Sequence, residues 1–110
     1  MEQFILVITN LPDAASANSL AGHLVQQKLA ACVNRLPGVR SIYRWQGEIE
    51  EADEVTLLIK TTQRCYGELE TEIKNRHPYQ VPEIIVMPII GGSMPYLDWI
   101  AHETKKDVNV

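Results

Sequence analysis

The sequence predicts an α+β fold in which helices cover one face of an antiparallel sheet, and three observations carry that prediction. Residues 39–61 alternate apolar and polar side chains along two arms, which is typical of a long β-hairpin. Residues 4–9 form a nearly unbroken apolar run, which is typical of a central strand that is covered on both faces. Residues 14–29 and 62–75 instead repeat their apolar side chains at helical spacing.

The ends of the second helix follow from local signals. Thr61 or Thr62 is placed to cap its first turn, because threonine hydroxyls accept hydrogen bonds from free backbone N–H groups. Pro78 disfavours helical geometry at His77, so this helix is expected to stop near Asn75.

The remaining elements complete the order. Residues 30–35 read as a short extended segment, which Pro37 and Gly38 break or bulge before the long hairpin. Residues 84–90 read as a strand, and Pro88 restricts it to a sheet edge or a bulge because proline has no N–H. A last helix follows. The order strand, helix, strand, strand, helix, strand is the ferredoxin-like split βαβ arrangement with an extra C-terminal helix, and its first and third strands are central.

The totals limit the class of protein. We expect 110 residues to form one domain, residues 1–110, with a real core. The net charge of −4, with no run of Lys or Arg, argues against nucleic acid or an anionic membrane as a partner. The first residues resemble neither a signal peptide nor a membrane span, so we expect a cytoplasmic protein. In that compartment Cys32 and Cys65 are expected to stay free.

The predicted hairpin is too long for its own domain. Each arm runs about nine or ten residues, or roughly 30 Å at about 3.3 Å per residue. A domain of this length is expected to be only about 35 Å across. The outer half therefore needs another surface, and a second copy of the chain is the simplest partner. Tyr43 and Trp45 share one hairpin face, and large rings of this kind are enriched at interfaces.

Few residues point directly to chemistry. The acidic run from Glu48 to Glu54 is interpreted as a solvated hairpin tip, because it lacks the glycine and the ligand spacing of a calcium loop. No two Cys or His residues have close metal-ligand spacing. A catalytic pair of Cys32 with a histidine is conceivable, although neither a glycine-rich elbow nor a helix start follows Cys32.

The strongest candidate site is a group of aromatic and polar side chains that the predicted fold gathers. They form either a ligand-binding cleft between subunits or a subunit interface in which Lys60 and Glu83 pair at the rim, and both interpretations stay open. The group consists of Tyr43, Trp45, Lys60, His77, Tyr79 and Glu83.

Six segments carry a resemblance to a known family. They are Leu29–Asn34, Ser41–Gly47, Ile59–Thr61, His77–Ile84, Pro88–Ile89 and Tyr96–Trp99. Together they are similar to the CutA family of divalent-cation tolerance proteins over about residues 4–103. The resemblance implies a tight homotrimer joined largely through the long hairpins, a link to copper tolerance and binding of divalent cations. It implies no established catalytic activity.

The resemblance also suggests a metal site and an alternative function. Some bacterial relatives are credited with copper ligands at three positions that here read Thr9, Arg76 and His77. We therefore expect weak Cu(II) binding through His77, alone or with Cys32 or a symmetry copy. CutA trimers resemble the PII signalling proteins, so the alternative is a regulatory module that binds a small anion or metabolite between subunits. A third hypothesis is a hydrolase that uses Cys32 or His77.

Overall fold

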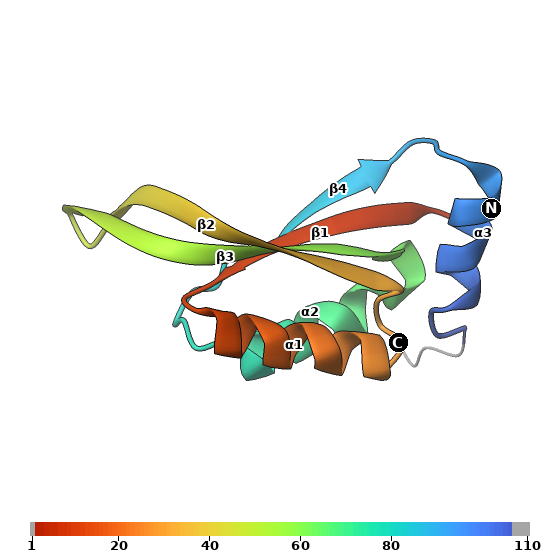
Figure 1. Cartoon of the computed structure of the whole chain (residues 1–110), viewed down its shortest axis with the longest axis horizontal. Helices are drawn as coiled ribbons and strands as arrows, with labels where there is room; N and C mark the ends of the chain where they lie inside the picture. The colour runs from red at the N-terminus through yellow and green to blue at the C-terminus, as the bar shows by residue number, and fades with distance from the viewer. Residues whose placement is uncertain (1, 107–110) are drawn as a thin grey trace.

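A four-stranded antiparallel sheet, with α1 and α2 on one face, forms the centre of the structure (Figure 1). The computed structural model describes residues 2–106. The strand order β2-β3-β1-β4 confirms the predicted ferredoxin-like α+β fold, with the first and third strands central and the proline-containing β4 at an edge. The elements are β1 (Phe4–Leu11), α1 (Ala14–Gln26), β2 (Cys32–Trp45), β3 (Glu48–Thr62), the 3₁₀ turn η1 (Gln63–Cys65), α2 (Tyr66–Arg76), β4 (Ile85–Ile89) and α3 (Met94–His102).

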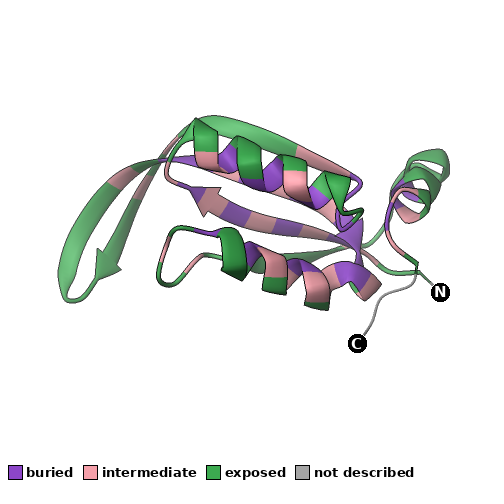
Figure 2. Cartoon of the chain, turned by 90° about the horizontal axis from the view of Figure 1, so that it is seen from below, coloured by how far each residue is buried: buried purple, intermediate pink, exposed green. Residues whose placement is uncertain are grey.

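The core lies between the sheet and the two helices (Figure 2). Burial alternates along β1, where every second residue from Ile5 to Leu11 is buried. Leu57 and Ile59 of β3 continue this layer, because each faces the same side of the sheet as its β1 neighbours. The side chains of α1 and α2 that close the core are fully buried, and the largest are Leu20, Leu24, Leu69 and Ile73.

The hairpin is longer than predicted. β2 has 14 residues and β3 has 15, joined by a two-residue turn at Gln46 and Gly47. Both turn residues have positive φ angles, of 50° and 85°, as a type I′ hairpin turn requires. The turn precedes the acidic run, so the expected acidic tip was wrong, and the run lies on β3. The bulge expected near Pro37 and Gly38 is confirmed as a register shift between Leu36 and Val39.

Neither threonine expected to cap the second helix does so. The Thr61 hydroxyl donates to the Leu29 carbonyl at 2.7 Å, inside the core. Thr62 precedes η1, and its hydroxyl lies 3.4 Å from the Cys65 sulfur instead of capping a backbone N–H. The helical segment therefore begins as a 3₁₀ turn. It ends at Arg76, close to the predicted position.

The second face of the sheet is largely uncovered within one chain. Leu6 and Ile8 alternate with the buried residues of β1 and are only half-buried. Their β4 neighbours Met87 and Ile85 are 41% and 48% exposed. Among the described residues, only α3 packs on this face, at one end, where Leu97 and Ile100 contact Phe4 and Ile89. The apolar run in β1 predicted cover on both faces, and the single chain provides it on one.

Candidate functional site

A cavity of about 680 Å³ opens between the outer half of the hairpin and the loop after α2. Tyr43 and Trp45 of β2 form one wall, and Tyr79 and Glu83 of the loop lie on another. Its volume is within the range of about 300–1,000 Å³ that is typical of small-molecule sites. The structure therefore brings together four of the six residues that the sequence suggested for a cleft.

Lys60 does not belong to this cavity. Its Nζ lies 3.4 Å from the Tyr96 hydroxyl and 5.7 Å from the centre of that ring. Glu83 instead accepts a hydrogen bond of 3.0 Å from Asn10 Nδ2. The strand register explains the separation, because Lys60 pairs with Leu6 at the opposite end of β1 from Asn10. Lys60 and Glu83 therefore do not pair within one subunit, and a pair across a subunit interface stays a prediction.

His77 is buried behind the cavity and anchors the loop. Its Nε2 lies 2.7 Å from the Asn10 carbonyl oxygen, and its Nδ1 accepts the backbone N–H of Tyr79 at 3.2 Å. The Nε2 atom therefore carries the proton and donates it to the carbonyl. Burial lowers the pKa of His77, although the hydrogen bond to Asn10 and the Glu54 charge oppose that shift. The imidazole is thus neutral, and both of its ring nitrogens take part in hydrogen bonds.

Cys32 lies far from His77. It opens β2 opposite Lys60, and Lys60 is four residues along β3 from Thr56, the neighbour of Asn10. Four residues of strand span roughly 13 Å. The structure therefore brings Cys32 and His77 together neither as a pair of metal ligands nor as a catalytic pair.

Glu54 is the site residue that sequence reasoning missed. It was assigned to a solvated tip, yet it is 8% exposed and accepts the Tyr79 hydroxyl at 2.8 Å. Burial raises the pKa of Tyr79, and the hydrogen bond and the negative charge of Glu54 raise it further. Tyr79 is therefore a hydrogen-bond donor at all physiological pH values. The signal in the sequence was the position of Glu54 next to the core residue Val55, at the base of the hairpin.

Acidification from about pH 7.5 to about pH 5.5 is expected to lower the free energy of unfolding, and His77→Gln is expected to remove part of that loss. The pKa of His77 in the folded chain lies below the unfolded value of about 6.5. The unfolded chain therefore takes up this proton first, and stability falls as the pH drops through that window. Asp13 and Glu72, whose pKa values are also lowered, change the free energy of unfolding only at lower pH.

Urea unfolding at a series of pH values measures this effect. His23 and His102 remain in the variant, so the difference between the two pH profiles isolates His77. Identical pH profiles for the wild type and His77→Gln would contradict the assigned role of His77.

Comparison with known proteins identifies the family. The model of the CutA1 divalent ion tolerance protein family matches residues 5–103. The chain belongs to the CutA1 family. It is 46% identical over 104 residues to the divalent-cation tolerance protein CutA of Thermus thermophilus, covering 94% of this chain and 99% of that protein. It is also 42% identical to the chloroplastic protein CutA of Arabidopsis thaliana, over 92% of this chain but only 56% of that longer protein.

Solved CutA1 structures share the whole fold. The Thermus thermophilus structure has a TM-score of 0.90 at 46% identity, covering 96% of this chain and all of that one. The CutA1 structure from Oryza sativa has a TM-score of 0.93 at 38% identity, covering 96% of both chains. The long hairpin and α3 are therefore features that this chain shares with other CutA1 proteins.

The CutA1 family name implies divalent ions, and the ligands expected here do not form a common site in one subunit. Both nitrogens of His77 are hydrogen-bonded, and Cys32 is at the other end of the sheet. Among residues 2–106, no group of three or more His, Cys, Asp or Glu side chains is arranged to hold a metal ion. Cys32 and Cys65 are free thiols, as predicted. No helix in this described part is long and apolar enough to cross a membrane.

Proposed function

We propose that the chain is a homotrimeric, non-catalytic divalent-cation tolerance protein that binds divalent cations weakly and works in the cytoplasm. The uncovered apolar face of the sheet is the observation that carries the assembly. Ile8 lies at its centre, with Leu58 of β3 on one side and Ile85 of β4 on the other. Contiguous apolar surface of this kind marks an interaction site in a monomeric subunit.

The hairpin supports the same assembly. It extends the long axis of the subunit to 44 Å, against 28 Å and 24 Å for the other two, and its outer half projects from the body (Figure 1). Ile42 and Ile49 on that half are 70% and 61% exposed. A closed ring of copies covers such surfaces and leaves no free edge, whereas an open chain of copies grows into fibres. The resemblance to CutA trimers favours three copies.

The positions of the thiols and imidazoles support weak cation binding without catalysis. A nucleophilic thiol needs a base within hydrogen-bond reach, and the hydrogen-bond partners of His77 place it at the far end of the sheet from Cys32. His77 is able to ligate a metal only after giving up a buried hydrogen bond. The free state of both cysteines suits the reducing cytoplasm.

Titration of the metal-free protein with Cu(II) or Zn(II) is expected to give dissociation constants no tighter than about 1 µM. The reason is that only one of the three suggested copper ligands, His77, is present, and freeing its imidazole costs the bond to Asn10. His77→Ala is expected to weaken Cu(II) binding further, and light scattering on the same samples is expected to show a trimer. Nanomolar Cu(II) affinity that persists in His77→Ala would place the metal elsewhere.

The cavity favours a second candidate function, a PII-like regulatory module. Its wall of aromatic rings and its few convergent polar groups are typical of metabolite sites. Binding of a metabolite there is expected to raise the unfolding temperature by mass action.

A further inference from the structure

We infer that this cavity binds a small organic cation, a compound with an ammonium or guanidinium group. The inference rests on the second candidate function, which makes the cavity a ligand site, and extends it by naming the charge and the chemical class of the ligand. Glu54, the aromatic wall and the charge pattern of the hairpin carry it.

Glu54 is a buried carboxylate without a counter-charge among residues 2–106. It is 8% exposed and lines the cavity. Tyr79 donates to its Oε2, and within residues 2–106 its Oε1 accepts no hydrogen bond and Glu54 takes part in no ion pair. This Oε1 is not sealed from solvent, and Glu54 is one of the residues that line the cavity. Because a carboxylate accepts about four hydrogen bonds, a donor that carries positive charge fits this position.

The rings around this carboxylate suit a cation as well. Tyr43, Trp45 and Tyr79 all line the cavity, and aromatic faces attract ammonium and guanidinium groups. Glu83 adds a second carboxylate to the lining. No Lys or Arg is among the lining residues that the structure describes. From the described residues of one subunit, a small anion would therefore meet two negative charges and no positive one.

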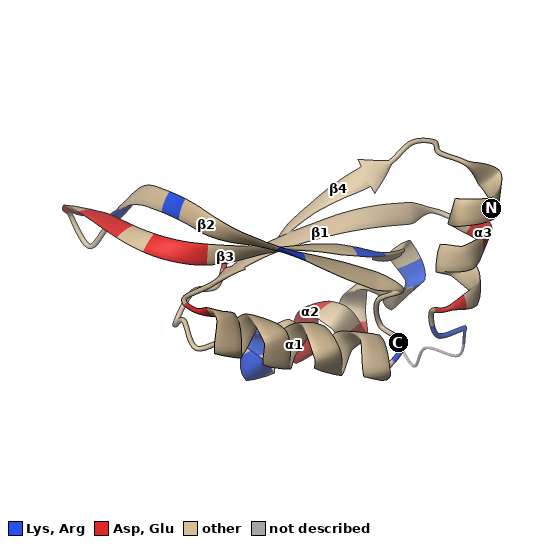
Figure 3. Cartoon of the chain, viewed as in Figure 1, with Lys and Arg blue, Asp and Glu red and all other residues tan. Residues whose placement is uncertain are grey.

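The hairpin extends the same negative charge outward. Its register places Glu48 opposite Trp45 and Glu50 opposite Tyr43, on the face that also carries Glu54. The arginines of the outer half of β2 alternate to the opposite face. Figure 3 shows acidic residues along the projecting part of β3, next to β2. A surface of one sign next to a cavity raises the local concentration of the oppositely charged ligand.

The lining favours an organic cation over a bare metal ion. A hard divalent ion takes about six to eight oxygen ligands at short range. The cavity instead offers two carboxylates within a wide space bounded by rings, and residues 2–106 hold no cluster of three metal-ligating side chains. An extended molecule with a charged end uses both the carboxylate and the rings.

Calorimetric titration of the full chain with agmatine, which carries a guanidinium and an ammonium group, tests the inference. Agmatine is expected to bind, and Glu54→Gln is expected to weaken its binding by about tenfold or more, because one charged hydrogen bond is lost. Glu51→Gln is the matched control. It removes the same charge from the same strand, but Glu51 pairs with Arg40 on the opposite face and is expected to leave the affinity unchanged.

Tyr43→Leu provides a second test that leaves Glu54 in place, and it is expected to reduce agmatine affinity several-fold. Equal affinity in the wild type and Glu54→Gln, or tighter binding of 2-oxoglutarate or Mg²⁺ than of agmatine, would overturn the inference. Light scattering separates it from the proposed assembly. If the wild type does not bind agmatine and Glu54→Gln dissociates the oligomer, the carboxylate belongs to a contact between copies. That result overturns the cation site and leaves the assembly standing.

Discussion

Ile8→Asp is expected to convert the proposed trimer into folded monomers of 12.4 kDa. In a free subunit the new carboxylate lies on a half-buried sheet face and costs about 1 kcal/mol of stability. In the proposed assembly this face, where Leu58 and Ile85 flank position 8, is covered, and a buried charge without a partner costs about 3–5 kcal/mol for each copy. Because every subunit of the assembly carries this unfavourable free energy, dissociation is expected even at micromolar protein concentration.

Light scattering gives the mass of each variant, and circular dichroism shows whether it is folded. Ser19→Asp is the control, because it adds the same charge to an exposed position of α1 on the other side of the sheet. It is expected to remain trimeric. A wild type that is already a 12.4 kDa monomer would reject the proposed assembly, and a trimeric Ile8→Asp would show that the open face is not the interface.

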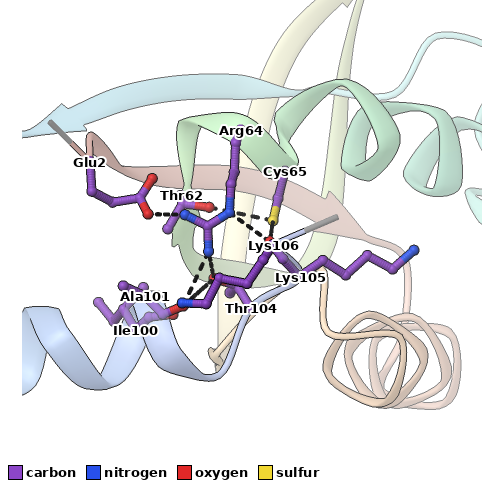
Figure 4. A network of polar contacts seen from close by, with 9 residues as sticks. All are labelled: Glu2, Thr62, Arg64, Cys65, Ile100, Ala101, Thr104, Lys105 and Lys106. Carbon is purple, nitrogen blue, oxygen red and sulfur yellow. Dashed lines mark hydrogen bonds and ion pairs between the residues drawn. The ribbon is translucent and has the colours of Figure 1, made fainter. Parts of the chain in front are cut away.

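Arg64→Ala is expected to lower the free energy of unfolding by about 3 kcal/mol, because it removes charged hydrogen bonds from a partly buried group. Figure 4 shows the guanidinium between η1 and the end of α3. It donates to the carbonyls of Lys105 at 2.6 Å and Ala101 at 3.1 Å, and to the Thr104 hydroxyl at 3.2 Å. Glu2 pairs with it from the start of the chain. One side chain thus caps α3 and fastens it to the body.

Hydrogen exchange gives the sharper readout for Arg64→Ala. The amides of α3 are expected to lose protection while those of β1 keep theirs, because Arg64 bonds the end of α3 and leaves the core cluster intact. Arg64→Lys keeps the charge but not the planar fork, and it is expected to recover only part of the loss. Equal protection of α3 in Arg64→Ala and wild type would show that its apolar contacts with Phe4 and Ile89 suffice.

The fold was predictable because its signals are local. The helical spacing in α1 and α2, the alternation in the hairpin and the missing N–H of Pro88 each act within a few residues. The errors came from positions where two signals compete. The acidic run was interpreted as the hairpin tip, so Glu54 was expected in solvent. The turn is instead formed by Gln46 and Gly47, and Glu54 is buried.

The candidate site was only half predictable for a different reason. The structure brings Tyr43, Trp45, Tyr79 and Glu83 around one cavity because the outer half of the hairpin and the loop after α2 both lie at the Asn10 end of β1. Within one subunit Lys60 lies apart from them, because strand register, which the composition of a strand does not reveal, carries it to the other end of the sheet. The same register separates Cys32 from His77.

The sequence by itself determined the order of the elements, the central place of β1, the edge place of β4 and the family, because each depends on residue type and spacing along the chain. The tertiary structure alone decided which polar groups meet. Glu54, which was expected on the surface, is buried and accepts a hydrogen bond from Tyr79. His77 is buried as a neutral imidazole that anchors the loop. These pairs join residues that are far apart in the chain, and they depend jointly on packing, strand register and desolvation.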